Sequence, residues 1–170
     1  METTSTSTTD RLPATQPPAD RTEDKETVQR TLKHLITLNY DSVGAYEMAA
    51  DLLKNEQYVQ ICREYVEQRN HFIDELSHLI SEYGAEAPDV ESMAGLMQDV
   101  WMNIRNIVSG NDTAVIVECD RGDELAIEHY HDALNKSLPE DVDILLRKQF
   151  GLLKGGHERI HRLADALQQG

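Results

Sequence analysis

Four polar residues, each on the apolar stripe of a different expected long helix, constrain the fold of this sequence more than any other feature. They are Asn39, Arg69, Asp123 and Gln149. Apolar residues recur at helical spacing around each one, so each is expected to face the interior of a helical core. Counted from the expected turns between the helices, the four residues lie at about the same height. We therefore expect an all-α bundle that carries a polar layer through its middle.

Helical periodicity predicts four long helices, at residues 26–53, 57–83, 113–136 and 139–167, and a shorter helix at residues 93–108. A helical hairpin needs a connection of only about two to eight residues. The stretch from Gly84 to Asn111 is far longer than that, and its helical part is long enough to run back along the bundle. Two antiparallel hairpins joined by one long helical crossover form a ferritin-like four-helix bundle.

The first 22 residues differ from the rest in composition. They are rich in Ser, Thr and Pro and have almost no large apolar side chain, so we expect a disordered tail at residues 1–22 and a single bundle domain at residues 23–170. The N-terminus has neither the basic start nor the apolar core of a signal peptide, and no apolar run is long enough for a membrane span. We therefore expect a cytoplasmic protein that does not insert into a membrane.

The charge of the chain argues against binding to nucleic acid. The chain has 31 acidic and 16 basic residues, a formal net charge of -15. Such a surface repels nucleic-acid phosphates, so we expect no nucleic-acid partner. The two cysteines, Cys62 and Cys119, fall on apolar helix positions without a metal-ligand spacing, and we expect buried free thiols.

Several stretches of the chain resemble a known family. YDSVGAYEMAADLL, EYVEQRNHFIDEL, WMNIRNIVSGND, ECDRGDELAIEHYHDAL and GGHERIHRL resemble a bacterial family of ferritin-like four-helix-bundle proteins that carries a domain-of-unknown-function label. The resemblance covers about residues 30 to 165. It implies the ferritin-like fold and brings no established reaction.

A ferritin-like dimetal centre needs inward-facing carboxylates and two Glu-x-x-His pairs. Glu75 with His78 and Glu158 with His161 match the pair as strings. On a helical projection, however, Glu75 lies roughly 95°, His78 roughly 155° and Glu158 roughly 180° from the centres of their apolar stripes. A weaker alternative is an iron or manganese site at stripe edges, built from Glu47, Glu64, Glu118 and His157. We favour no metal and no cofactor, because these positions are more usual for solvated rim residues.

The polar layer itself predicts a specific ion pair. A buried guanidinium without a carboxylate would cost several kcal/mol, so Asp123 is the expected partner of Arg69. The expected layer consists of Asn39, Tyr46, Gln68, Arg69, Asp123 and Gln149. It fills the volume where a dimetal centre would lie, and its arginine repels cations. A ligand pocket between the helices is an alternative use of this layer.

These observations lead to two functional hypotheses. The first is a non-enzymatic ferritin-like bundle protein with a stress-associated or assembly role, whose core is fixed by Arg69 and Asp123. The second is an iron or manganese oxidoreductase or storage protein that uses the edge residues. A homo-oligomer formed through the 93–108 crossover helix or a bundle face is the expected alternative to packing of that helix on its own bundle.

Overall fold

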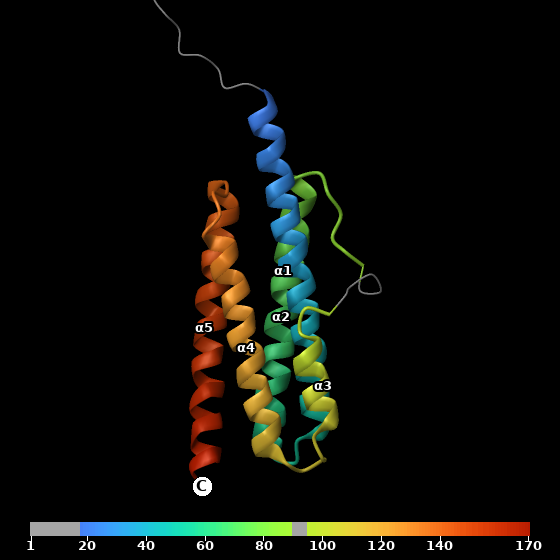
Figure 1. The fold of residues 1–170 in the computed structure, drawn as a ribbon, viewed down its shortest axis with the longest axis vertical. Helices are drawn as coiled ribbons and strands as arrows, with labels where there is room; N and C mark the ends of the chain where they lie inside the picture. The colour runs from blue at the N-terminus through green and yellow to red at the C-terminus, as the bar shows by residue number, and fades with distance from the viewer. Residues whose placement is uncertain (1–17, 90–94) are drawn as a thin grey trace, which may run out of the picture.

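The computed structural model describes residues 18–89 and 95–170, and side chains from residue 24 on. These ranges are helical and contain no strand, which confirms the all-α prediction. Figure 1 shows the helices, which are α1 (Pro18–Leu52), α2 (Glu56–Glu82), α3 (Gln98–Asn106), α4 (Asp112–Leu134) and α5 (Glu140–Gln169). None of them is long and apolar enough to cross a membrane.

The connection between α2 and α4 runs back along the length of the bundle (Figure 1). α1 and α2 form one antiparallel hairpin, and α4 and α5 form the other. The start of α4 lies beside the turn between α1 and α2. There the Asp112 carboxylate accepts hydrogen bonds from the backbone N–H groups of Lys54 and Asn55. α2 therefore ends at the opposite end from the start of α4, and the connection crosses between the two ends, as its length predicts.

Two helix boundaries differ from the sequence prediction. α1 begins at Pro18 rather than near residue 26, so residues 18–22 of the expected tail are helical. Proline fits this first position because its missing N–H would have no partner there. Residues 1–17, the rest of the expected tail, lie outside the described residues. The crossover helix α3 covers Gln98–Asn106, so residues 95–97, 107 and 108 of the expected 93–108 helix are not α-helical, and residues 93 and 94 lie outside the described residues.

α3 packs on its own bundle. The side chains of Met97, Val100 and Ile104 are buried. The Trp101 ring lies over Gly44 of α1, where an added Cβ atom would come within 2.2 Å of the ring, and its Nε1–H donates to the Asp41 carbonyl at 2.8 Å. The absence of a side chain at Gly44 thus makes room for α3 beside α1.

Candidate functional site

Arg69 and Asp123 form an ion pair in the interior of the bundle. Their Nη2 and Oδ1 atoms are 2.9 Å apart, and the side chains are 1% and 2% exposed. The second carboxylate oxygen accepts a hydrogen bond from the Tyr46 hydroxyl at 2.7 Å, and Arg69 Nη1 donates to Gln68 Oε1. Arg69 Nε has no hydrogen-bond partner among the residues that the structure describes. The four residues thus form one network that links α1, α2 and α4.

The protonation of this network follows from its burial. Burial raises the pKa of the Asp123 carboxyl, and the Arg69 guanidinium and the Tyr46 hydroxyl act in the opposite direction because both favour the carboxylate. Burial and the neighbouring Asp123 carboxylate raise the pKa of Tyr46, which keeps its hydroxyl protonated as a donor. A carboxylate with two such donors balances the permanent charge of Arg69.

Asn39 and Gln149 belong to a second network, centred on Tyr130. The Tyr130 hydroxyl accepts from Asn39 Nδ2 and donates to Gln149 Oε1, both at 2.8 Å. Gln149 Nε2 in turn donates to the Glu75 carboxylate at 3.0 Å. Burial raises the pKa of the Tyr130 phenol, which therefore remains a donor.

The expectation that all the interior polar residues form one layer is wrong. Asp123 and Tyr130 are seven residues apart on α4, which is about 10 Å along a helix. The Phe72 ring lies between the two networks, with its centroid 5.6 Å from the Arg69 guanidinium carbon and 6.5 Å from that of the Tyr130 ring. The interior therefore has two polar tiers separated by an aromatic side chain.

The cavity beside Asp123 is too small for an organic ligand. It has a volume of about 10 Å³ and lies against Ser42, Tyr46, Met97 and Asp123 among others. Such a space holds at most about one water molecule. The alternative of a ligand pocket within the Arg69–Asp123 network thus has no support from this geometry.

The alternative metal ligands Glu47, Glu64, Glu118 and His157 do not gather at one place. Glu47 is exposed on α1. Glu64 pairs with Arg159 at 2.7 Å, and Glu118 contacts Asn103 and Arg121. The side chains of the two Glu-x-x-His pairs do not meet at a common interior site either. His78 is 80% exposed, Glu75 pairs with Lys148, and Glu158 is exposed.

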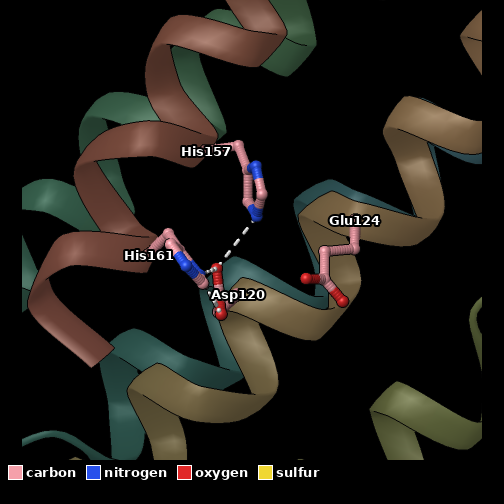
Figure 2. Close-up of side chains that lie close together, drawn as sticks. All are labelled: Asp120, Glu124, His157 and His161. Carbon is pink, nitrogen blue, oxygen red and sulfur yellow. Dashed lines mark hydrogen bonds and ion pairs between the residues drawn. The ribbon is translucent and has the colours of Figure 1, made fainter. Parts of the chain in front are cut away.

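A different set of metal-ligating side chains does gather, on the outer side of the α4–α5 hairpin. Asp120 and Glu124 come from α4, and His157 and His161 come from α5 (Figure 2). One ligand atom from each lies within 4.8 Å of the other three. Asp120 is in the centre, with one carboxylate oxygen 3.0 Å from His157 Nε2 and the other 3.0 Å from His161 Nδ1. We call these four residues the histidine–carboxylate cluster.

The two histidines differ in their surroundings. His157 is 18% exposed, and its Nε2 lacks a hydrogen bond because the contact with Asp120, although short, is poorly aligned. His161 is 48% exposed, and its Nε2 lies 3.6 Å from Asp165 on the far side of the ring from Asp120. The hydrogen bond and the charge of Asp120 raise the pKa of His161.

Sequence reasoning missed this cluster for two reasons. It sought Glu-x-x-His pairs, whereas the cluster combines Asp120-x-x-x-Glu124 with His157-x-x-x-His161. Residues four apart share one face of a helix, so this spacing was a usable signal. The expected hairpin register also placed Glu118 opposite His157, but the structure places Asp120 there, two positions further along α4.

Comparison with known proteins gives a family and a fold. The model of a family described as a domain of unknown function, DUF2383, matches residues 27–136. The chain belongs to the DUF2383 family. A solved structure, that of the conserved hypothetical protein rv2844 from Mycobacterium tuberculosis, is similar in fold with a TM-score of 0.66 at 11% identity, over 81% of this chain and 97% of that chain. The search of curated proteins gave no match.

The DUF2383 match includes all of the interior ion pair but only half of the histidine–carboxylate cluster. It includes Arg69 and Asp123, and it also includes the two carboxylates of the histidine–carboxylate cluster. His157 and His161 lie on α5, beyond the matched residues. The family assignment therefore covers the interior ion pair completely and the cluster only in part.

Proposed function

We propose that this DUF2383 protein is a non-enzymatic, ferritin-like helical bundle in which a buried arginine–aspartate network stands where a dimetal centre would be. The observation that carries the proposal is the Arg69–Asp123 ion pair, at 2.9 Å and almost completely buried. Ferritin-like metal ligands project into the bundle core from all four helices. At the Arg69–Asp123 network, the side chains that project inward are instead a guanidinium, one carboxylate and neutral polar groups.

Charge and volume both support this proposal. A dimetal centre needs several inward carboxylates to balance two divalent cations. The network instead has one carboxylate, which Arg69 already neutralises, and a positive guanidinium that repels a cation. The adjoining cavity of about 10 Å³ leaves no room for a substrate. The network thus fits a role in fixing helix register better than a role in chemistry.

Ferrous iron oxidation in air tests the proposal directly. Metal-free protein is mixed with Fe²⁺, and formation of ferric iron is followed by absorbance. We expect the same rate as in buffer that contains an equally acidic, unrelated protein, and no change with Glu64→Ala or Glu118→Ala. Rapid oxidation that Glu118→Ala or Glu64→Ala abolishes would establish the alternative, an iron oxidoreductase or storage protein. Rapid oxidation that only His161→Ala abolishes would also contradict a non-enzymatic role, and would assign it to the histidine–carboxylate cluster.

The homo-oligomer remains a separate proposal. Among the described residues, the exposed large apolar side chains are Met102 on α3, Val108 just after α3, and Ile144 and Leu152 on α5. Since the apolar stripe of α3 is covered by its own bundle, α5 offers the better face for a second copy. Light scattering after size exclusion should show a dimer that Ile144→Glu with Leu152→Glu converts to a monomer, whereas Met102→Glu leaves it unchanged. A monomer in the wild type would exclude the proposal.

A further inference from the structure

We propose that Asp120, Glu124, His157 and His161 form a mononuclear site for a divalent transition metal ion, with Zn²⁺ as the best-fitting ion. The site joins α4 to α5 on the outer side of the hairpin (Figure 2). It is distinct from the interior position expected for a ferritin-like centre. Its function would be to clamp α4 to α5 in the second hairpin, because the metal would bind side chains of both helices at once.

The ligand set has the right chemistry for such an ion. Imidazole nitrogens and carboxylate oxygens are common ligands of Zn²⁺, usually four in a tetrahedral site. Two neutral imidazoles and two carboxylates carry a formal charge that balances one divalent cation. The interior network has no negative charge left to balance a metal ion, because Arg69 already neutralises Asp123.

The geometry is close to what coordination requires. Ligand atoms of a tetrahedral zinc site are about 3.4 Å apart, since each bond is about 2.1 Å long. The four candidate atoms lie within 4.8 Å of one another, and the Asp120 oxygens are already 3.0 Å from His157 Nε2 and from His161 Nδ1. Glu124 and His161 are exposed, so their side chains are free to move about 1 Å by rotamer adjustment without disturbing the core.

Two further observations point to a ligand at this place. The buried Nε2 atom of His157 faces Asp120 without a hydrogen bond, so this nitrogen has no well-aligned partner within the described residues. In addition, Asp165 lies 3.6 Å from the His161 ring nitrogen that faces away from the cluster. Metal-bound histidines usually have a carboxylate on that outer nitrogen, which orients the ring and raises its basicity.

The competing interpretation is a network of ion pairs without metal. In this interpretation the contacts of Asp120 with the two imidazoles, one of them a hydrogen bond to His161, hold the cluster together. This interpretation predicts no stoichiometric metal binding near neutral pH. The strongly acidic surface does predict weak binding at many sites, so the test must distinguish one tight site from many weak ones.

The test is calorimetric titration of the metal-free full-length protein with Zn²⁺, together with Co²⁺ titration followed by visible absorption. We expect one tightly bound ion per chain, and visible absorption bands that indicate a low coordination number of the bound Co²⁺. His161→Ala and Asp120→Asn should each weaken Zn²⁺ binding by at least about tenfold, on the order of the losses seen when metal-site residues are removed. His161 is exposed, so this variant should fold normally, which circular dichroism checks.

His78→Ala is the matched control. His78 is also a helical histidine beside a carboxylate, 3.7 Å from Glu82, but no second histidine joins them. This variant should bind Zn²⁺ as the wild type does. Zn²⁺ should also raise the melting temperature of the wild type and of His78→Ala, and not that of His161→Ala. Binding that is equal in all variants, or weak and without defined stoichiometry, would overturn the proposal.

Discussion

The Nη2 atom of Arg69 lies 2.9 Å from Oδ1 of Asp123, and the two residues come from different hairpins of the bundle. Arg69 is on α2 of the first hairpin, and Asp123 is on α4 of the second. This buried ion pair thus links the two hairpins across the core, as the hydrogen bonds from Tyr46 to Asp123 and from Asn39 to Tyr130 also do. Because an arginine stays charged at every accessible pH, loss of either partner leaves an uncompensated buried group.

We first predict that Arg69 and Asp123 are strongly coupled in stability. Arg69→Met should lower the free energy of unfolding by about 3 to 5 kcal/mol, because Asp123 would remain buried with the Tyr46 hydroxyl as its main donor. Arg69→Met combined with Asp123→Leu should recover much of this loss and still fold as a helical protein. Urea unfolding of the wild type, both single variants and the double variant measures the coupling free energy.

The exposed pair Arg159 and Glu64 is the control for this cycle. Its atoms are 2.7 Å apart, but the side chains are 47% and 44% exposed. The coupling in an Arg159→Met and Glu64→Leu cycle should be about 0 to 1 kcal/mol because solvent screens the charges. Equal coupling in both cycles would show that burial does not strengthen the interior pair.

The second prediction concerns two glycines inside helices. Gly44→Ala should destabilise the protein by about 1 to 2 kcal/mol. The new methyl would clash with Trp101, and this overpacking cost exceeds the gain of about 1 kcal/mol in helix propensity. Trp101 is the single tryptophan of the chain, so its fluorescence should also shift toward the exposed range.

Gly155→Ala provides the opposite case. Gly155 is exposed on α5, and an added Cβ atom would meet nothing within 4 Å. This substitution should therefore stabilise the protein by up to about 1 kcal/mol, through helix propensity alone, and leave the tryptophan fluorescence unchanged. Destabilisation by both substitutions would mean that the clash with Trp101 is not the cause.

The third prediction concerns the start of the crossover helix. The Asp41 carboxylate on α1 accepts hydrogen bonds from the backbone N–H groups of Leu96 and Met97, just before α3 begins. It supplies the cap that no residue of α3 provides. Asp41→Ala should cost about 1 to 2 kcal/mol, the usual cost of losing a helix cap. Hydrogen exchange should show faster opening of α3 than of α4 in this variant, and unchanged exchange in α3 would contradict the assignment.

The all-helical fold could be predicted from the sequence because apolar residues recur at helical spacing along all four long helices. Their apolar stripes place the helices, and the long stretch between Gly84 and Asn111 requires a crossover. The pairing of Arg69 with Asp123 was also predictable, because a buried guanidinium requires a carboxylate and Asp123 was the one on an apolar stripe.

The rest depends on tertiary detail. Tyr130 was not expected in a polar network, because helical spacing does not show which buried tyrosine hydroxyl will meet a polar partner. The histidine–carboxylate cluster depends on the register of the α4–α5 hairpin. That register follows from where α4 ends and α5 begins, and helix ends are the least predictable feature of a sequence pattern. A difference of two positions replaced Glu118 with Asp120 opposite His157.

The last prediction is a pH dependence of stability that arises at His34. His34 Nε2 lies 2.9 Å from His129 Nδ1 between α1 and α4. Burial lowers the pKa of His34, and the nearby charges of His129 and Lys136 act in the same direction. Because the folded state binds this proton less readily than the unfolded state does, stability should fall as the pH drops below the unfolded value of about 6.5.

Urea unfolding of the wild type and of His34→Gln at about pH 7.5 and pH 5.5 measures this effect as the difference between the two proteins, so that contributions from other histidines cancel. We expect the wild type to lose more stability on acidification than His34→Gln does, whereas His78→Gln, at a histidine that is 80% exposed, should behave like the wild type. An identical loss in the wild type and His34→Gln would show that the histidine pair does not sense pH.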